Sequence, residues 1–266
     1  MGRDMLNDFD VIAHSFPDEI NIYAVADVHL GAIEHNEQAW SAFLKRVKAE
    51  NAKIILVGDL LNNGVRTCKF ANPFDETLRP REAKARMVEY LEPLAENLLC
   101  SVSGNHCRRT EIMTDNDLSY DIMAQLGKEH LYRQNFAVLL IGTGKRPKAE
   151  RPECCYSMVF THGAGGGTLT GSATNRAEDF GRTFDGLDAL ILGHTHKGFI
   201  THPSKIVIDA RNQRVSMKHF CVVSCESWLD YGGYAARAML RPAETCRPQK
   251  LHLSADHHNK KITATW

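Results

Sequence analysis

Apolar runs alternate with amphipathic stretches along the chain up to about residue 200. Short apolar runs predict buried strands, and apolar residues that recur every three or four positions predict helices. The predicted strands in this part are 20–26, 53–57, 98–103, 137–141, 157–160 and 189–192, and the predicted helices are 37–50, 79–98 and 119–126. Pro93 should kink or split the second helix, because proline removes a backbone donor.

The pattern changes in the last quarter of the chain. Strand-like segments follow one another there with few helices between them, at 205–208, 215–224, 234–240, 250–253 and 261–266. Alternating strands and helices followed mostly by strands predict a mixed α/β (α+β) fold with more than one sheet. The length of 266 residues, with no repeat and no long linker, predicts a single domain over 1–266.

Composition and charge narrow the possible binding partners and cellular locations of the protein. Lys plus Arg and Asp plus Glu both number 32, so no overall charge attracts the protein to nucleic acid or to an anionic membrane. No apolar stretch approaches the roughly 18 residues of a membrane span, and the first residues lack the apolar run of a secretory signal. We therefore expect a soluble cytoplasmic protein with no membrane partner. Without a secretory signal, the eight cysteines are expected to be reduced thiols, and the absence of a CxxC pair argues against a thiolate zinc knuckle.

Polar side chains that can bind metal follow five of the predicted strands. They are Asp27 and His29, Asp59, Asn105 and His106, His162, and His194 and His196. Ligands bind outside the carboxyl ends of strands in open α/β sheets, so these side chains should share one site. Imidazole, carboxylate and amide oxygen together suit manganese, iron or zinc. The spacing of Asp27 and His29 should turn both to the same side if the strand continues. Asp59 has two oxygens with which it can bridge two ions.

The order Asp-x-His, Gly-Asp, Gly-Asn-His, His-Gly and Gly-His-x-His resembles the signature of the calcineurin-like metallophosphoesterase superfamily. The similarity spans residues 27–196, about two-thirds of the chain. It implies a four-layer αββα sandwich of two mixed sheets flanked by helices. It also implies two divalent metal ions, with manganese as the first candidate and zinc, iron or magnesium as alternatives.

The same resemblance implies a role for each residue of the signature. The first metal would take Asp27, His29, Asp59 and His196, and the second would take Asp59, Asn105, His162 and His194. His106 would contact the phosphate and donate a proton to the leaving group, while a metal-bridging hydroxide would be the nucleophile.

Cys107 departs from the family pattern, which usually has an acidic residue after the histidine. Such a carboxylate orients the histidine and raises its basicity. We therefore expect that His106 either has another partner or is a weaker acid.

Weaker candidates lie beside the signature. Arg108 and Arg109 could bind phosphate through their guanidinium groups, although a solvated surface explains them equally well. Asn62 could orient water or substrate. The glycine-rich stretch 163–171 is either a flexible loop or a substrate loop that meets phosphate.

The resemblance favours a phosphodiesterase that acts on nucleotides or nucleic acid. The segments ADVHLGA and GDLL are similar to the nuclease-like branch, which includes double-strand-break repair exonucleases, and the His-Gly loop resembles phage-associated phosphoesterases. The alternatives are a phosphomonoesterase or a cyclic-nucleotide phosphodiesterase. The remaining hypothesis is a metal-binding scaffold without catalysis. The presence of all seven ligand positions and of His106 argues against it.

Overall fold

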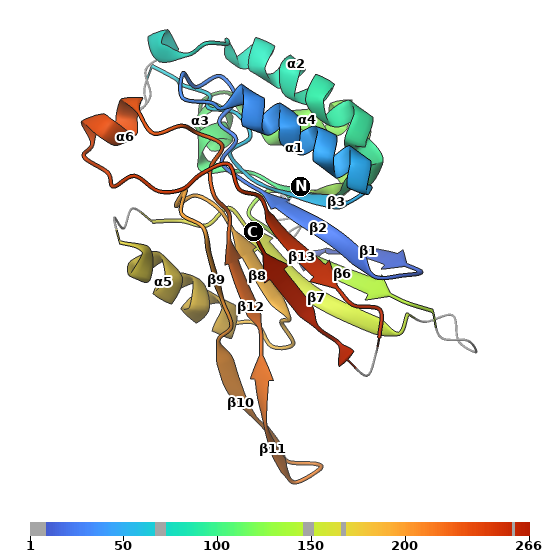
Figure 1. Cartoon of the computed structure of the whole chain (residues 1–266). Helices are drawn as coiled ribbons and strands as arrows, with labels where there is room; N and C mark the ends of the chain where they lie inside the picture. The colour runs from blue at the N-terminus through green and yellow to red at the C-terminus, as the bar shows by residue number, and fades with distance from the viewer. Residues whose placement is uncertain (1–8, 67–72, 146–151, 166–168, 257–258) are drawn as a thin grey trace.

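Figure 1 shows the computed structural model of the chain, which describes residues 9–66, 73–145, 152–165, 169–256 and 259–266. Two six-stranded mixed sheets form its centre, with helices against their outer faces.

The first sheet has the strand order β14-β13-β2-β3-β4-β5. Its strands are β14 (Ile262–Thr265), β13 (Gln249–Leu253), β2 (Ile20–Val25), β3 (Lys53–Val57), β4 (Leu98–Val102) and β5 (Tyr132–Arg133). Strands β2 to β5 run parallel, and β13 pairs antiparallel with β2. The carboxyl ends of the parallel strands therefore meet at one edge of the sheet.

The second sheet has the strand order β1-β6-β7-β8-β12-β9. Its strands are β1 (Val11–Phe16), β6 (Phe136–Thr143), β7 (Cys154–Thr161), β8 (Ala189–Leu192), β12 (Cys221–Ser224) and β9 (Phe199–Thr201). Strands β7 and β8 are parallel, and Thr161 pairs with Leu192 at their ends. The loops after these two strands consequently leave the sheet side by side.

Helices complete the layers. The first sheet is covered by α1 (Glu37–Glu50), α2 (Pro80–Leu91) and α4 (Leu118–Gln125), and the second sheet by α5 (Thr170–Arg182) (Figure 1). Strand β8 shows how the layers pack: Ala189 and Ile191 join the large core that includes both sheets, whereas Leu190 and Leu192 pack with residues of α5. Two layers of sheet between two layers of helix give the predicted α/β sandwich.

Local sequence accounts for the clearest elements. Helix α1 is capped at its start by Asn36, whose side chain accepts a hydrogen bond from the Ala39 amide at 2.8 Å, and at its end by the left-handed residue Asn51. The predicted bounds of this helix and of strands β3 and β8 are confirmed. The expected break at Pro93 is also confirmed, because α2 ends at Leu91 and a 3₁₀ helix, Glu92–Asn97, follows.

Other expectations for single elements are wrong. The predicted strand at 234–240 is the short helix α6 (Gly233–Arg237), in which two alanines favour helix. The predicted strand at 215–224 is two strands, β11 (Arg214–His219) and β12, which belong to different sheets. Strand β1 and the helices α3 (Asn105–Thr114) and α5 were not expected at all.

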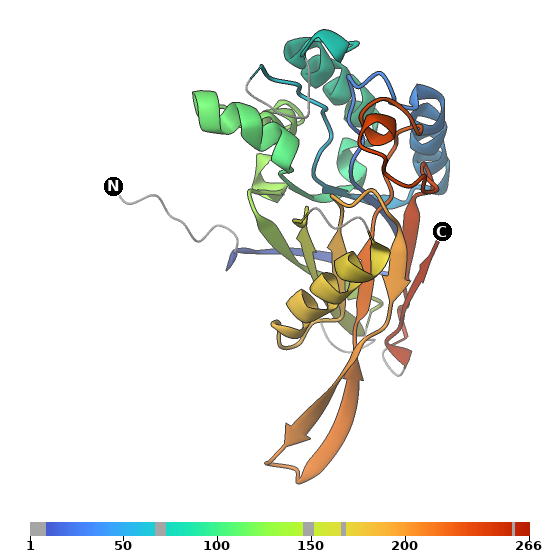
Figure 2. The ribbon, with the colours of Figure 1, turned by 90° about the vertical axis from the view of Figure 1, so that its left-hand side faces the viewer.

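Strand β11 pairs with β10 (Ser204–Asp209) in a two-stranded hairpin that extends away from the sandwich in both views (Figures 1 and 2). The register places four exposed apolar side chains on one face of it, namely Ile206, Ile208, Val215 and Met217. None of the helices in the described ranges combines the length and apolar character that a membrane span requires.

Candidate metal centre

Seven candidate ligands lie directly after strands of both sheets. The loops after β2 and β3 carry Asp27, His29 and Asp59, and the loops after β7 and β8 carry His162, His194 and His196. Asn105 follows β4 as the first residue of α3. The structure brings all seven side chains together where the carboxyl ends of the two sheets meet.

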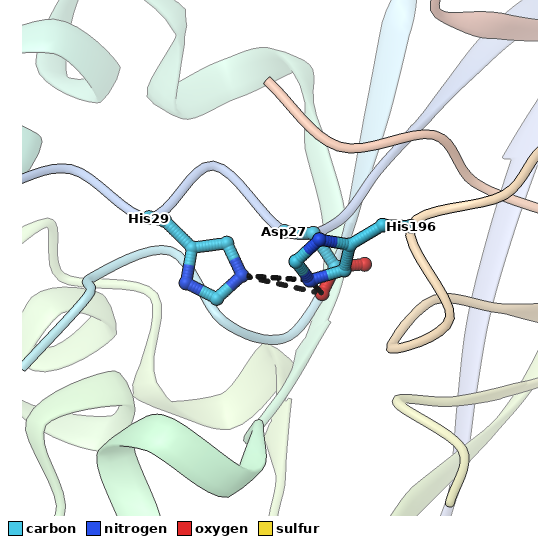
Figure 3. Close-up of side chains that lie close together, drawn as sticks. All are labelled: Asp27, His29 and His196. Carbon is cyan, nitrogen blue, oxygen red and sulfur yellow. Dashed lines mark hydrogen bonds and ion pairs between the residues drawn. The ribbon is translucent and has the colours of Figure 1, made fainter. Parts of the chain in front are cut away.

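Asp27, His29 and His196 form the first cluster (Figure 3). The Nε2 atoms of the two imidazoles lie 3.1 Å apart, and they lie 3.6 Å (His29) and 3.2 Å (His196) from Asp27 Oδ1. Ligand atoms that share one ion at about 2.0–2.2 Å are roughly 2.8–3.6 Å apart, depending on the coordination geometry. The first cluster therefore has the spacing of a set of ligands to one ion.

Asp59, Asn105, His162 and His194 form the second cluster. Asn105 Oδ1 lies 3.0 Å from His162 Nε2 and 2.8 Å from His194 Nδ1. Asp59 Oδ2 lies 3.1 Å from the same His162 nitrogen. These distances fall in the same range as those of the first cluster.

Asp59 joins the two clusters. The Asp59 carboxylate belongs to two sets of neighbouring side chains, one with Asp27 and His162 and the other with His29 and His106. Within each set, the atoms that could bind metal lie within 4.8 Å of one another. Asp59 Oδ1 accepts a hydrogen bond from the His106 amide at 2.8 Å. Gly104 permits this approach, since a Cβ there would lie 2.1 Å from Asp59 Oδ1.

The loops reach this arrangement through an unusual backbone. We expected strand geometry to turn Asp27 and His29 to the same side, but both residues have positive φ angles, 53° and 49°. The strand therefore ends before Asp27, and a curled loop brings the two side chains together. Its shape is held by the Asp27 and His29 amides, which donate to the carbonyls of Gly58 and Asp59 at 3.1 and 3.0 Å.

The ionised carboxylates and surrounding imidazoles of the centre are suited to binding divalent cations. Burial by itself would raise the pKa of Asp59, but His162 and His106 hold that pKa below its usual range. Burial would likewise lower the pKa of His162, yet Asp59 raises it to about 9. Asp27 Oδ1 is buried and accepts no well-formed hydrogen bond from the described residues. Ionised, buried carboxylates surrounded by imidazoles, with an oxygen left without a donor, are suited to metal ions.

His106 lies beside both clusters at the start of α3. Its Nε2 atom lies 3.7 Å from Asp59 Oδ2, and its Nδ1 atom lies 2.5 Å from the carbonyl oxygen of Asn62. A carbonyl oxygen only accepts, so Nδ1 carries a hydrogen and Nε2 faces the centre. Burial lowers the pKa of His106 to about 3. The neighbouring Cys107 is fully buried, and burial raises the pKa of its thiol to about 12.

Residues 20–198 match the family model described as calcineurin-like phosphoesterase, which covers more than half of the chain. The chain belongs to this family. It is therefore a metal-dependent phosphoester hydrolase, and the phosphoesterase fold expected from the motifs is confirmed.

Two solved structures are similar to this phosphoesterase. One is a predicted phosphoesterase from Streptococcus pneumoniae, with 10% sequence identity and a TM-score of 0.37 over 93% of this chain and 97% of that one. The other is the calcineurin-like phosphoesterase YfkN from Bacillus subtilis, with 11% identity and a TM-score of 0.41 over 93% of this chain and 90% of that one. No curated protein sequence matches the chain.

The weaker candidates occupy different places around the centre of this phosphoesterase. Arg109 Nη1 lies 3.2 Å from His106 Nδ1, but Nδ1 donates to Asn62 and a guanidinium only donates, so Arg109 lies beside the candidate site without a hydrogen bond to this nitrogen. Arg108 is directed to Glu111, at 3.5 Å, and its side chain is half exposed. The side-chain amide of Asn62 donates to Glu76 at 2.8 Å. The glycine-rich stretch lies partly outside the described residues, which omit 166–168.

Sequence reasoning missed Glu76, which contacts the loop behind His106. It lies in a segment without hydrophobic periodicity, 17 positions after Asp59, and no motif marks it. Only the folded chain shows that Glu76 Oε1 lies 2.8 Å from Asn62 Nδ2 and 2.7 Å from the Gly64 amide.

Proposed function

We propose that this phosphoesterase is a dinuclear phosphodiesterase that hydrolyses nucleotide or nucleic-acid phosphodiesters. The observation that carries the proposal is the pair of ligand clusters joined by one buried carboxylate. One ion would be held by Asp27, His29, Asp59 and His196, and the other by Asp59, Asn105, His162 and His194. Manganese is our first candidate, since carboxylate, amide oxygen and imidazole together suit it.

When bound, two divalent ions would lower the pKa of a water and neutralise charge on the phosphoryl oxygens. The remaining work belongs to side chains of the protein. Because Nδ1–H is held on the Asn62 carbonyl, His106 can give a proton from Nε2 to the leaving oxygen only as the imidazolium, a form that the negative charge of a bound phosphoester beside Nε2 favours. The Arg109 guanidinium lies beside the ring and can stabilise negative charge on the substrate.

A pocket of about 300 Å³ that is lined in part by the residues directly after His196 supports a diester rather than a small monoester. Lys197, which directly follows the ligand His196, lines it together with Arg241 and Arg247. Pockets of this size can hold a second substituent of a phosphate. Glu226 and Glu244 also line the pocket and pair with Arg247, so its lining carries charges of both signs.

The test compares substrate classes on one preparation. The protein is stripped of metal and reloaded with manganese, zinc, iron or magnesium, and the hydrolysis of aryl phosphodiesters and phosphomonoesters is measured. Single-stranded DNA, RNA and cyclic nucleotides follow with the best metal. We expect faster cleavage of diesters and cleavage of at least one nucleotide substrate. Cleavage of monoesters alone would refute the phosphodiesterase proposal, and no cleavage with any metal would leave only a metal-binding scaffold.

A further inference from the structure

The turn at residues 62–64 holds His106 from behind. The Asn62 carbonyl accepts the hydrogen of His106 Nδ1, and the Asn63 side-chain amide donates to the His106 carbonyl at 2.7 Å. Asn63 is buried and has a φ of 49°, so the turn is strained and needs neighbours to keep its shape. The family pattern usually has an acidic residue after the histidine, but the buried thiol of Cys107 cannot supply a carboxylate.

Glu76 clamps this turn on both sides of the strained residue. One carboxylate oxygen, Oε1, accepts from the Asn62 side chain at 2.8 Å and from the Gly64 amide at 2.7 Å. The contact is close, because a Cβ at Gly64 would lie 2.4 Å from Oε1 and a Cβ at Gly31 would lie 2.9 Å from Oε2. Glu76 is thus fixed by hydrogen bonds and by packing. Burial raises the pKa of Glu76, while the bonds from Gly64 and Asn62 favour its ionised form.

We propose that Glu76 is a positioning residue for His106: by clamping the turn, it keeps the Asn62 carbonyl on Nδ1 and so aims Nε2 at the leaving group. This inference rests on the proposed function, in which His106 donates the proton. Glu76 hydrogen-bonds to Asn62 and Gly64, and His106 in turn bonds to the Asn62 carbonyl, so Glu76 acts on His106 through the backbone of the turn. It takes the place that a carboxylate next to the histidine would otherwise have.

The test compares Glu76→Ala and Glu76→Gln with the wild-type protein, all loaded with metal. Two sets of aryl phosphodiesters are used, with a nitrophenol or a phenol as the leaving group. Phenol is the poorer leaving group and depends more on the proton from His106. We expect Glu76→Ala to lower kcat for the phenyl ester about tenfold to hundredfold, with less than about a twofold change for the nitrophenyl ester. Glu76→Gln should recover part of the loss, since its amide oxygen still accepts one bond.

Asp75→Asn is the matched control, because Asp75 is the adjacent carboxylate and lies about half exposed near Arg237. It should leave both rates unchanged. In a His106→Ala background, Glu76→Ala should cause no further loss, since the two residues act on the same step.

Bound metal is measured in each variant and should equal that of the wild-type protein. Equal losses for both leaving groups, loss of metal in Glu76→Ala, or a further loss in the double variant would each overturn the positioning role. If the wild-type protein cleaves no phosphoester at all, the proposed function fails instead, so the two failures can be told apart.

Discussion

Five of the seven candidate ligands have a left-handed backbone, which residues other than glycine rarely adopt. They are Asp27, His29, Asp59, His194 and His196, with φ between 49° and 71°. Each costs about 1–2 kcal/mol. In an extended strand, residues two apart are separated by about 6.6 Å. The curled backbone instead brings His29 Nε2 to 3.6 Å from Asp27 Oδ1, which is the range that one ion requires. Strain of this kind is commonly concentrated at functional sites.

Asp59→Asn tests the joining carboxylate at the same scale. Asparagine has nearly the same shape and can still accept from the His106 amide, but it removes the negative charge shared by both clusters. We expect loss of bound metal and a fall in turnover of at least about a thousandfold. Metal content and aryl phosphodiester hydrolysis measure the effect.

Asp115→Asn is the control for Asp59→Asn, because Asp115 has a similar φ of 57° but caps the exposed end of α3. It should keep the metal and the activity of the wild-type protein. Near wild-type turnover in Asp59→Asn would show that this carboxylate does not join two ions.

The identities of the candidate site residues can be predicted from sequence, because each follows an apolar run and strand ends meet at one edge of a sheet. The contacts that hold His106 cannot be predicted in this way. Its Nδ1 partner is a backbone carbonyl, which every residue has, and Glu76 reaches the turn only through the fold. Nor does a pattern of apolar and polar residues show that φ is positive at Asp27 or His196.

At the scale of elements, helix α5 shows where hydrophobic patterning fails. Its buried face consists of Ala173, Ala177 and Gly181, spaced four residues apart. These small residues allow the helix to lie close to the second sheet, but they give little hydrophobic signal. Large apolar side chains on one face made α1 predictable to the residue. The stretch 163–171, predicted as a loop, overlaps only the first two residues of α5, and no element was predicted for the rest of that helix.

Two glycines in α5 should respond to alanine in opposite directions. A Cβ at Gly171 meets nothing within 4 Å, so Gly171→Ala should raise the free energy of unfolding by about 0.5–1 kcal/mol through reduced backbone entropy. A Cβ at Gly181 would lie 2.5 Å from the Phe220 ring, so Gly181→Ala should lower the free energy of unfolding by about 1–3 kcal/mol. Urea denaturation of both variants measures the difference. Stabilisation by both substitutions would mean that α5 does not pack closely on Phe220.

On the scale of the whole molecule, the candidate centre draws on both sheets. The first cluster takes Asp27 and His29 from the loop after β2 in one sheet, and His196 from the loop after β8 in the other. The second cluster likewise takes Asn105 from the end of β4 in the first sheet and His162 from the loop after β7 in the second sheet. A bound ion would therefore link the two sheets at the edge where their loops meet. Without an ion, these loops hold buried carboxylates and imidazoles whose hydrogen-bonding atoms are only partly paired, as at Asp27 Oδ1 and His29 Nδ1.

Metal should consequently stabilise the whole fold as well as support catalysis. A ligand that binds only the folded state at one site adds about 2.7 kcal/mol at a hundred times its Kd. For a chain of this size, that corresponds to a rise in Tm of roughly 5–10 °C. We expect a rise of this order when manganese is returned to stripped protein, measured by thermal unfolding. His196→Ala should reduce the rise, because it removes the only first-cluster ligand from the second sheet, whereas the exposed His130→Ala should leave it unchanged. If Tm is the same with manganese and with a chelator, the ligands do not hold an ion between the sheets.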